Sequence, residues 1–164
     1  MIKEYIKGSI LDAKQKYIAH GVNCQNKMDS EVAKVLFKKY PDTKKHYHLS
    51  HEEFPKDDAS FFLGSIDYGH DSEKVTILNC WTQINYGYDG KKYVSYDAIY
   101  DVFKQLCDMR IKEVAIPKIG CGLAGGNWNI VKQIIDDATG DDLDVYVYYL
   151  EDRWSSKVTA TNIL

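Results

Sequence analysis

A glycine-rich stretch in the C-terminal half of the chain reads Ile116-Pro117-Lys118-Ile119-Gly120-Cys121-Gly122-Leu123-Ala124-Gly125-Gly126-Asn127-Trp128. It stands between a short apolar run and a segment with helical spacing. Four glycines within seven positions let the backbone approach a ligand closely, and successive N–H groups can form a nest for an anion. No Gly-Lys-Ser/Thr follows, which excludes a Walker-type phosphate loop. The stretch predicts a ligand-binding loop, with tight turns alone as the alternative.

Outward from this loop, short apolar runs alternate with longer segments of helical spacing. The apolar runs predict strands at Ile2–Ile6, Tyr17–Cys24, Phe61–Asp67, Val75–Trp81, Glu113–Pro117 and Asp144–Leu150. The helical spacing predicts one helix with Val32, Leu36 and Tyr40 on one face, a second over 95–109 and a third over 127–138. Strands that alternate with helices predict a largely parallel sheet covered on both faces.

The stretch over 46–53 looks irregular and holds three histidines, His46, His48 and His51. A metal site is conceivable there, but these histidines do not form an i, i+4 pair. The spacing therefore favours a solvated helix end or loop.

A second polar loop lies between the strand predicted at 17–24 and the helix that follows it. It reads Ala19-His20-Gly21-Val22-Asn23-Cys24-Gln25-Asn26-Lys27-Met28-Asp29-Ser30-Glu31-Val32-Ala33. Ligands of open parallel sheets collect at the carboxyl ends of strands, where a helix N-terminus offers N–H groups to an anion. The alternative is a plain connection with Asp29 or Ser30 as helix N-cap. Two such loops can close on one ligand from opposite sides, which favours a diphosphate.

The composition bounds the class of protein. The chain has 164 residues, of which 45% are hydrophobic and 27% charged, as in one ordinary globular domain. A net charge of -3 disfavours a binder of nucleic-acid backbones, since such proteins carry a basic excess. No apolar run approaches the ~20 residues of a membrane span, and the N-terminus lacks signal-peptide features, so we expect a cytoplasmic protein. The cysteines match no zinc or disulfide spacing and predict reduced thiols.

These motifs together resemble the macro domain family. The segment Lys7-Gly8-Ser9-Ile10-Leu11, the two loops and the apolar run before Leu150 match its motifs, and the resemblance covers residues 3–150. It implies an α/β protein with a three-layer α/β/α fold and a mixed, mostly parallel central sheet. A macro domain would span 1–150, followed by a C-terminal tail over 151–164. The motifs are most similar to the branch that holds ADP-ribose 1''-phosphate phosphatases and terminal ADP-ribose glycohydrolases, with small bacterial and bacteriophage members.

The resemblance also implies a ligand and a site. The ligand would be ADP-ribose or ADP-ribose 1''-phosphate, held by a monomer with no cofactor, metal, nucleic acid or membrane. Ile10 would contact the adenine, Asn23 the distal ribose, and residues 119–125 the phosphates. The implied catalytic residues are His20 and Asn23. The implied ligand-binding residues are Ser9, Ile10, Asn23, Met28, Asp29, Ser30, Glu31, Val32, Pro117, Ile119, Gly120, Cys121, Gly122, Leu123, Ala124, Gly125 and Tyr148.

Two departures from the family pattern bear on the activity. Gln83 and Ala124 stand where the glycohydrolase has a lysine and an aspartate, which disfavours that mechanism. Asp29 and Glu31 stand where glycines are usual, and like charges ~4 Å apart repel by ~1 kcal/mol in water. His20 could be a general acid or base, or a strand-end histidine bonded to backbone. We expect an ADP-ribose 1''-phosphate phosphatase. The alternatives are a non-catalytic binder of ADP-ribose or a related nucleotide, weakened by the two acids, and, less favoured, a mono-ADP-ribosyl hydrolase.

Overall fold

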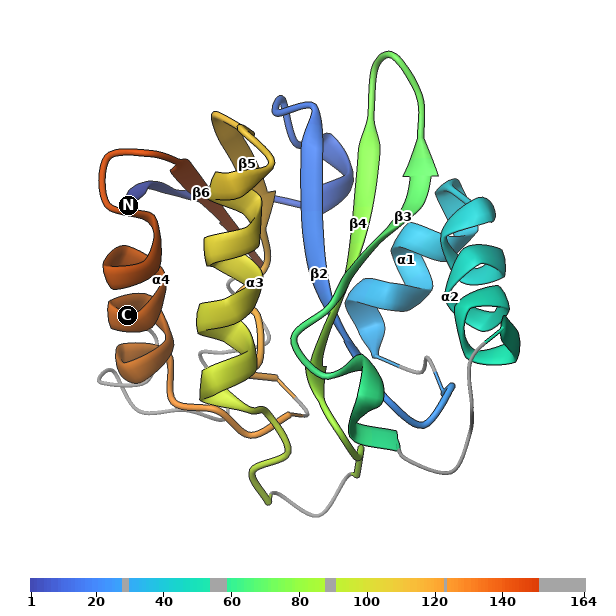
Figure 1. The fold of residues 1–164 in the computed structure, drawn as a ribbon. Coiled ribbons are helices and arrows are strands. Elements are labelled where there is room, and N and C mark those ends of the chain that lie inside the picture. Colours follow the sequence, from blue (N-terminus) through green and yellow to red (C-terminus); the bar gives the residue numbers. More distant parts are fainter. Residues whose placement is uncertain (28–29, 54–58, 88–90, 123, 151–164) are drawn as a thin grey trace.

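The computed structural model describes residues 1–27, 30–53, 59–87, 91–122 and 124–150 (Figure 1). The strands are β1 (Ile2–Lys7), β2 (Tyr17–Asn23), β3 (Ile66–Asp71), β4 (Thr76–Gln83), β5 (Glu113–Ile116) and β6 (Asp144–Tyr149). The helices are α1 (Glu31–Lys39), α2 (Asp42–Glu53), α3 (Tyr96–Asp108), α4 (Trp128–Thr139) and the short 3-10 helices η1 (Ile10–Asp12) and η2 (Ala59–Phe62). The expectations for Met28, Asp29, Leu123 and the tail over 151–164 lie outside the described residues.

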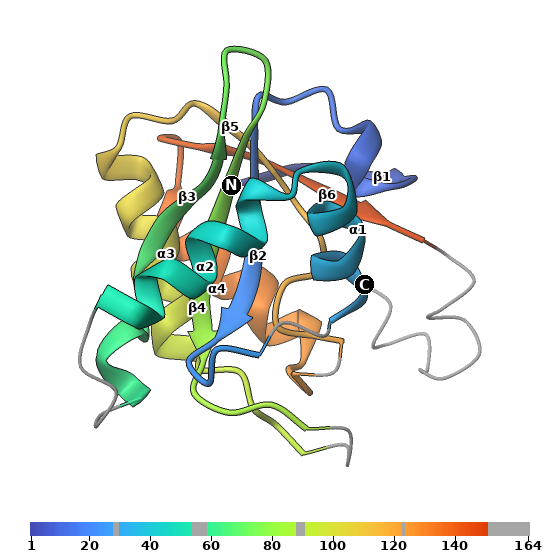
Figure 2. The same ribbon diagram turned by 90° about the vertical axis from the view of Figure 1, so that its right-hand side faces the viewer.

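The strands form one sheet in the order β1-β6-β5-β2-β4-β3. β3 pairs antiparallel with β4, and all other neighbours pair in parallel. Figures 1 and 2 show α3 and α4 over one face of the sheet and α1 and α2 over the other. The prediction of a three-layer α/β/α fold with a mixed, mostly parallel sheet is therefore confirmed.

Burial on both faces explains why the inner strands are so apolar. Every residue of β4 except the last is buried, as is typical of a strand between two helical layers. Alternate residues of β2 enter different clusters: Ala19 packs with residues of α3 and α4, whereas Ile18 packs with Leu36 of α1. The sheet therefore separates two apolar layers, as period-2 alternation of strand side chains requires.

Polar caps set where the helices next to the two loops begin. Ser30 Oγ accepts a hydrogen bond from the Ala33 N–H at 3.2 Å, so Ser30 is the N-cap of α1. Asn127 Oδ1 accepts one from the Asn129 N–H at 2.8 Å at the start of α4. Because Ser and Asn side chains satisfy N–H groups that a helix leaves unpaired, both helices start directly after a polar loop.

The strand predicted at Phe61–Asp67 is wrong except for its last two residues. Residues 59–62 form η2, and β3 begins only at Ile66. Between them Gly64 has a φ of 85°, a left-handed conformation that turns the chain. The Gly64 N–H then donates to the Trp81 carbonyl at 2.8 Å, which joins this turn to β4.

Of the two alternatives for residues 46–53, the structure has the helix end and not the loop, because these residues complete α2. The buried residues of this helix are Thr43, Tyr47 and His51, spaced four residues apart. The other positions are nearly all polar, so the apolar stripe that identifies a surface helix is almost missing from the sequence.

Candidate functional site

The loops that follow β2, β4 and β5 meet at one edge of the sheet. The three strands are parallel neighbours, so their carboxyl ends point the same way. A Cβ on Gly21 of β2 would lie 3.3 Å from Ile119 Cγ1 and 2.6 Å from Thr82 Oγ1. The glycine-rich loop, residues 117–126, therefore packs directly over β2, and position 21 leaves room for it by having no side chain.

The segment over 91–95 binds the glycine-rich loop from the side of α3. The N–H groups of Tyr93 and Val94 both donate to the Ala124 carbonyl oxygen, at 2.7 and 3.1 Å. The Ser95 N–H donates to the Thr82 carbonyl oxygen at 2.7 Å. The sequence does not identify Tyr93 and Val94 as residues that support the site, because their contacts are made by the backbone and leave no signal in the residue types.

Buried side chains support the glycine-rich loop from below. Ile119 is 2% exposed and Cys121 is 8% exposed. Burial raises the pKa of the Cys121 thiol to about 12, so this group is a protonated thiol at neutral pH. Its burial and protonation favour a supporting role for Cys121 in the loop.

Three backbone N–H groups of the glycine-rich loop are unpaired in the described part of the chain. They belong to Gly120, Gly122 and Ala124, of which Ala124 is buried, at 8% exposure. The Gly125 N–H, by contrast, donates to the Gly122 carbonyl at 3.1 Å, which folds the turn. Gly122 is exposed, and no atom lies within 4 Å of the position of a Cβ there. Unpaired donors on an exposed turn are the groups that bind an anion in a backbone nest.

The described part of the Asn23 loop, residues 23–27, is held by the side chain of Asn23, which is 8% exposed. Asn23 Oδ1 accepts a hydrogen bond from the Gln25 N–H at 2.9 Å, and Nδ2 donates to the Lys27 carbonyl. The Cys24 N–H donates to the Gln83 carbonyl at 3.0 Å, which joins the loop to the end of β4. Asn23 therefore lies at the expected edge and shapes its own loop.

An apolar cluster lies beside the Asn23 loop. Ile10 and Tyr148 are each 6% exposed, and Val32 of α1 packs against the same cluster. The Tyr148 hydroxyl donates to Gln15 Oε1 at 2.8 Å, so its ring is fixed under the η1 loop. Ser9 Oγ accepts from the Leu11 N–H at 3.1 Å as the N-cap of η1. The structure thus brings Ile10, Val32 and Tyr148 together, with Ser9 next to them.

His20 is buried in the helical layer of α1. It is 1% exposed, and its Nε2 donates to Asn79 Oδ1, its register neighbour on β4, at 2.6 Å. Its Nδ1 has no partner in the described part of the chain, and the ring meets the Phe37 ring edge-on at 6.2 Å. Burial lowers the pKa of His20 to about 4, so the imidazole is neutral at pH 7. This surrounding favours a structural role over contact with a ligand.

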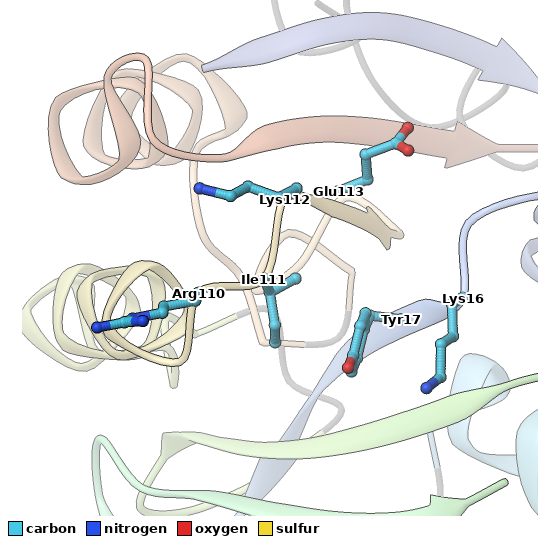
Figure 3. A pocket seen from close by; sticks show the side chains of 6 residues that line it. All are labelled: Lys16, Tyr17, Arg110, Ile111, Lys112 and Glu113. Atoms are coloured by element: carbon cyan, nitrogen blue, oxygen red, sulfur yellow. The ribbon is translucent and has the colours of Figure 1, made fainter. Parts of the chain in front are cut away.

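A cavity of about 280 Å³ lies at the opposite edge of the sheet. It is lined by Lys16, Tyr17, Arg110, Ile111, Lys112 and Glu113, at the amino ends of β2 and β5 (Figure 3). In Figure 3 the Arg110 and Lys112 side chains extend to one side and Lys16 lies apart from them, so the three do not converge on one point. The ligands of parallel sheets bind at carboxyl ends, so the Asn23 edge remains the candidate site.

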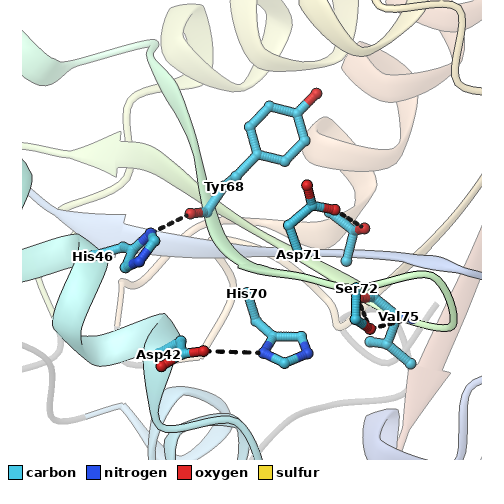
Figure 4. A network of polar contacts seen from close by, with 8 residues as sticks. Asp42, His46, Tyr68, His70, Asp71, Ser72 and Val75 are labelled. Atoms are coloured by element: carbon cyan, nitrogen blue, oxygen red, sulfur yellow. Dashed lines mark hydrogen bonds and ion pairs between the residues drawn. The ribbon is translucent and has the colours of Figure 1, made fainter.

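The histidines of α2 point to separate partners. His46 Nδ1 lies 3.1 Å from the Tyr68 carbonyl oxygen of β3 (Figure 4). Figure 4 also shows His70 of β3, whose Nδ1 lies 3.8 Å from Asp42 Oδ2. His51 Nε2 accepts from Trp81 Nε1 at 3.1 Å in the core. Within the described ranges no three His, Cys, Asp or Glu side chains are grouped as a metal site requires. Nor does any helix there have the length and apolar character to cross a membrane.

The family model of the Macro domain matches residues 19–135 of this chain. The chain is 31% identical over 143 residues to an uncharacterized 17.5 kDa protein of enterobacteria phage T4, covering 83% of this chain and 89% of the phage protein. It is 26% identical over 161 residues to an ADP-ribose 1''-phosphate phosphatase of Lodderomyces elongisporus, covering 90% and 99%. It is 23% identical over 146 residues to a DNA ADP-ribosyl glycohydrolase of Thermus aquaticus, covering 88% of this chain but only 40% of that protein.

Solved structures share the fold. A macrodomain protein of Streptomyces coelicolor superimposes with a TM-score of 0.72 at 25% identity, covering 91% of this chain and 99% of that one. DarTG of Thermosipho africanus, solved in complex with ADP-ribose, superimposes with a TM-score of 0.69 at 17% identity, covering 85% and 39%.

Proposed function

We propose that this chain, which belongs to the macro domain family, binds ADP-ribose or a phosphorylated relative at the carboxyl edge of its sheet. The diphosphate would lie between the glycine-rich loop and the Asn23 loop, with the adenine near Ile10 and the distal ribose near Asn23. The observation that carries this proposal is the set of open N–H groups on the glycine-rich loop, directly over β2. The names of two relatives and the ADP-ribose bound to a structural neighbour support the same ligand class.

The charge of the glycine-rich loop also suits a diphosphate. Lys118 belongs to this loop and is 7% exposed, with Nζ 6.0 Å from the centre of the Trp128 ring and 5.6 Å from that of Tyr149. Burial lowers the pKa of Lys118 from its usual value, and the nearby Cys121 opposes this shift. A lysine within the glycine-rich loop adds positive potential near the place where the phosphate oxygens would lie.

The binding proposal is tested by calorimetry on a charge placed in the nest. Gly122→Asp adds a carboxylate where space is open, so it should weaken ADP-ribose binding at least ~10-fold, which corresponds to ~1.4 kcal/mol. Ser72→Asp, an exposed position in the β3–β4 turn, adds the same charge at the opposite edge and should leave the affinity unchanged. Equal affinity in both variants, or no binding by the wild-type chain, would refute the proposed site.

A second candidate function is the hydrolysis of ADP-ribose 1''-phosphate to ADP-ribose and inorganic phosphate. It is favoured by the alignment with the Lodderomyces phosphatase over 99% of that protein. The neutral, buried His20 is a poor general acid or base, so the transition state would depend on Asn23 and the loop N–H groups.

Phosphate release from ADP-ribose 1''-phosphate separates this candidate from simple binding. We expect the His20→Gln rate to match that of the wild type and the Asn23→Ala rate to fall at least ~10-fold, as for loss of one transition-state hydrogen bond. Binding without phosphate release would leave the chain a non-catalytic binder, and loss of activity in His20→Gln would return His20 to the mechanism.

A further inference from the structure

Helix α2 reaches the Asn23 loop with one buried hydroxyl. Tyr47 is fully buried, and its hydroxyl lies 2.7 Å from the Asn23 carbonyl oxygen and 3.1 Å from Asn23 Oδ1, which share its single proton. The Tyr47 ring stacks on Trp81 of β4, with centroids 5.7 Å apart and planes 22° apart. Trp81 in turn donates to His51 of the same helix. The hydroxyl is therefore fixed by both a helix and a central strand.

The hydrogen bonds of the Asn23 amide leave a single polar position open. Oδ1 accepts from the Gln25 N–H and from Tyr47, and one proton of Nδ2 goes to the Lys27 carbonyl. An amide nitrogen has two protons, and the second has no acceptor among the described residues. If the amide were flipped, Nδ2 would face the Gln25 N–H, another donor. The amide can therefore offer a ligand an N–H group but not its oxygen.

The contacts of Asn23 with Gln25 and Lys27 fix the amide only relative to its own loop. The backbone bond of Cys24 joins the loop to the end of β4, whereas Tyr47 joins the Asn23 amide itself to the core. His48 adds a contact through Nδ1, 2.5 Å from Asn26 Oδ1. Asn26 has a φ of 59°, a left-handed conformation that asparagine adopts more readily than most residues other than glycine.

We propose that Tyr47 is a positioning residue, which holds Asn23 so that its Nδ2 N–H meets an acceptor oxygen of the distal ribose or its phosphate. The inference rests on the proposed function and specifies which ligand group Asn23 would contact. That group would be an oxygen that accepts a hydrogen bond from Nδ2. The contact would depend on the Tyr47 hydroxyl of α2, although this hydroxyl does not itself touch the ligand.

The test is Tyr47→Phe, which removes the hydroxyl and keeps the ring that stacks on Trp81. Titration calorimetry should show ADP-ribose bound ~10-fold more weakly, as for one lost hydrogen bond, while ADP, which lacks the distal ribose, keeps its affinity. Tyr68→Phe is the matched control, because Tyr68 is 46% exposed, and it should change neither affinity. Unchanged binding of both ligands, or equal weakening of both, would overturn the inference, since a merely structural tyrosine would not distinguish them.

A ligand-free measurement keeps this test separate from the proposed function. The Asn23 side-chain NH₂ signals, identified by their absence in Asn23→Asp, should exchange with solvent at least ~10-fold faster in Tyr47→Phe than in the wild type, because a loosened loop opens more often. Unchanged exchange would overturn the role of Tyr47 even if ADP-ribose binds. Faster exchange in a chain that binds neither nucleotide would support the role of Tyr47 in the loop and refute the ligand.

Discussion

The two loops of the candidate site are shaped by different parts of the chain. The glycine-rich loop is folded by backbone hydrogen bonds and close backbone packing, as in the two amides that share the Ala124 carbonyl. The Asn23 loop is folded by side chains, namely Asn23 itself, Tyr47 and His48. The glycine-rich loop therefore depends mainly on backbone contacts that a side chain at its glycines would block. The Asn23 loop depends mainly on side-chain hydrogen bonds. The two should respond to different substitutions, and the predictions below test this difference from the largest effect to the smallest.

The largest effect is expected from Gly125→Ala. Gly125 has a φ of 73°, and a Cβ there would lie 2.3 Å from the Lys91 carbonyl oxygen, a backbone atom that cannot turn aside. Left-handed strain of about 1–2 kcal/mol and overpacking of about 1–3 kcal/mol should together lower the free energy of unfolding by ~4 kcal/mol. Urea unfolding measures this loss. Gly122→Ala is the control, with open space and an expected change within ~0.5 kcal/mol. Similar losses in both variants would show that the backbone does not shape this loop as described.

The next effect concerns His20, below the Asn23 loop. The unfolded chain takes up a proton on this histidine near the usual histidine pKa of 6.5, whereas the folded chain does so only near pH 4. Between these values the unfolded state binds more protons, so stability is full above pH 6.5 and falls as the pH drops toward 4. This difference in the pKa of His20 between the unfolded and the folded chain corresponds to a loss of ~3 kcal/mol in the free energy of unfolding.

The measurement for His20 is urea unfolding between pH 7 and pH 4 for the wild type and for His20→Gln. Since glutamine does not titrate, the stability of the variant should fall less steeply over this window, with the slopes agreeing above pH 6.5. Parallel curves across the whole range would mean that His20 is solvated and charged in the folded chain. It would then belong to the site and not to the core.

The smallest effect is expected from Glu31→Gln at the start of α1. Glu31 is exposed and acidic, and it stands at the helix end that the diphosphate would approach. Removing a repulsion of ~1 kcal/mol should tighten ADP-ribose binding ~5-fold, while loss of the favourable helix-dipole contact costs ~0.5 kcal/mol of stability. Calorimetry at low salt measures the gain in ADP-ribose affinity. Calorimetry at high salt checks that this gain shrinks, because salt screens the repulsion that the substitution removes. Glu52→Gln on α2 is a control with no expected gain. Weaker binding in Glu31→Gln would mean that Glu31 contributes a contact to the ligand.

The sequence predicts most of the sheet and three of the α-helices, because these elements have strong period-2 or helical patterns. β4 is a clear case, since strands buried on both faces become nearly continuous apolar runs. α2 is the opposite case. It buries Tyr47 and His51 among polar neighbours, so its pattern resembles a solvated loop. β3 begins later than predicted because one left-handed glycine, Gly64, turns an otherwise apolar run.

The candidate site is predictable at the level of loops but not of contacts. The glycines and Asn23 point to the edge of the sheet at which β2 and β5 end, since residue type and strand order suffice for that. The burial of His20 could also be anticipated, because it shares a face of β2 with Ile18 and Val22. Tyr47 could not be anticipated, because its role requires both that α2 be a helix and that this helix pack against the end of β2.

The carbonyl oxygen of Ala124, which accepts both the Tyr93 and the Val94 N–H groups, has one more consequence. These amides lie immediately before α3, some thirty residues earlier in the chain, so the start of that helix is tied directly to the glycine-rich loop. A substitution that shifts the start of α3 would therefore also shift the glycine-rich loop.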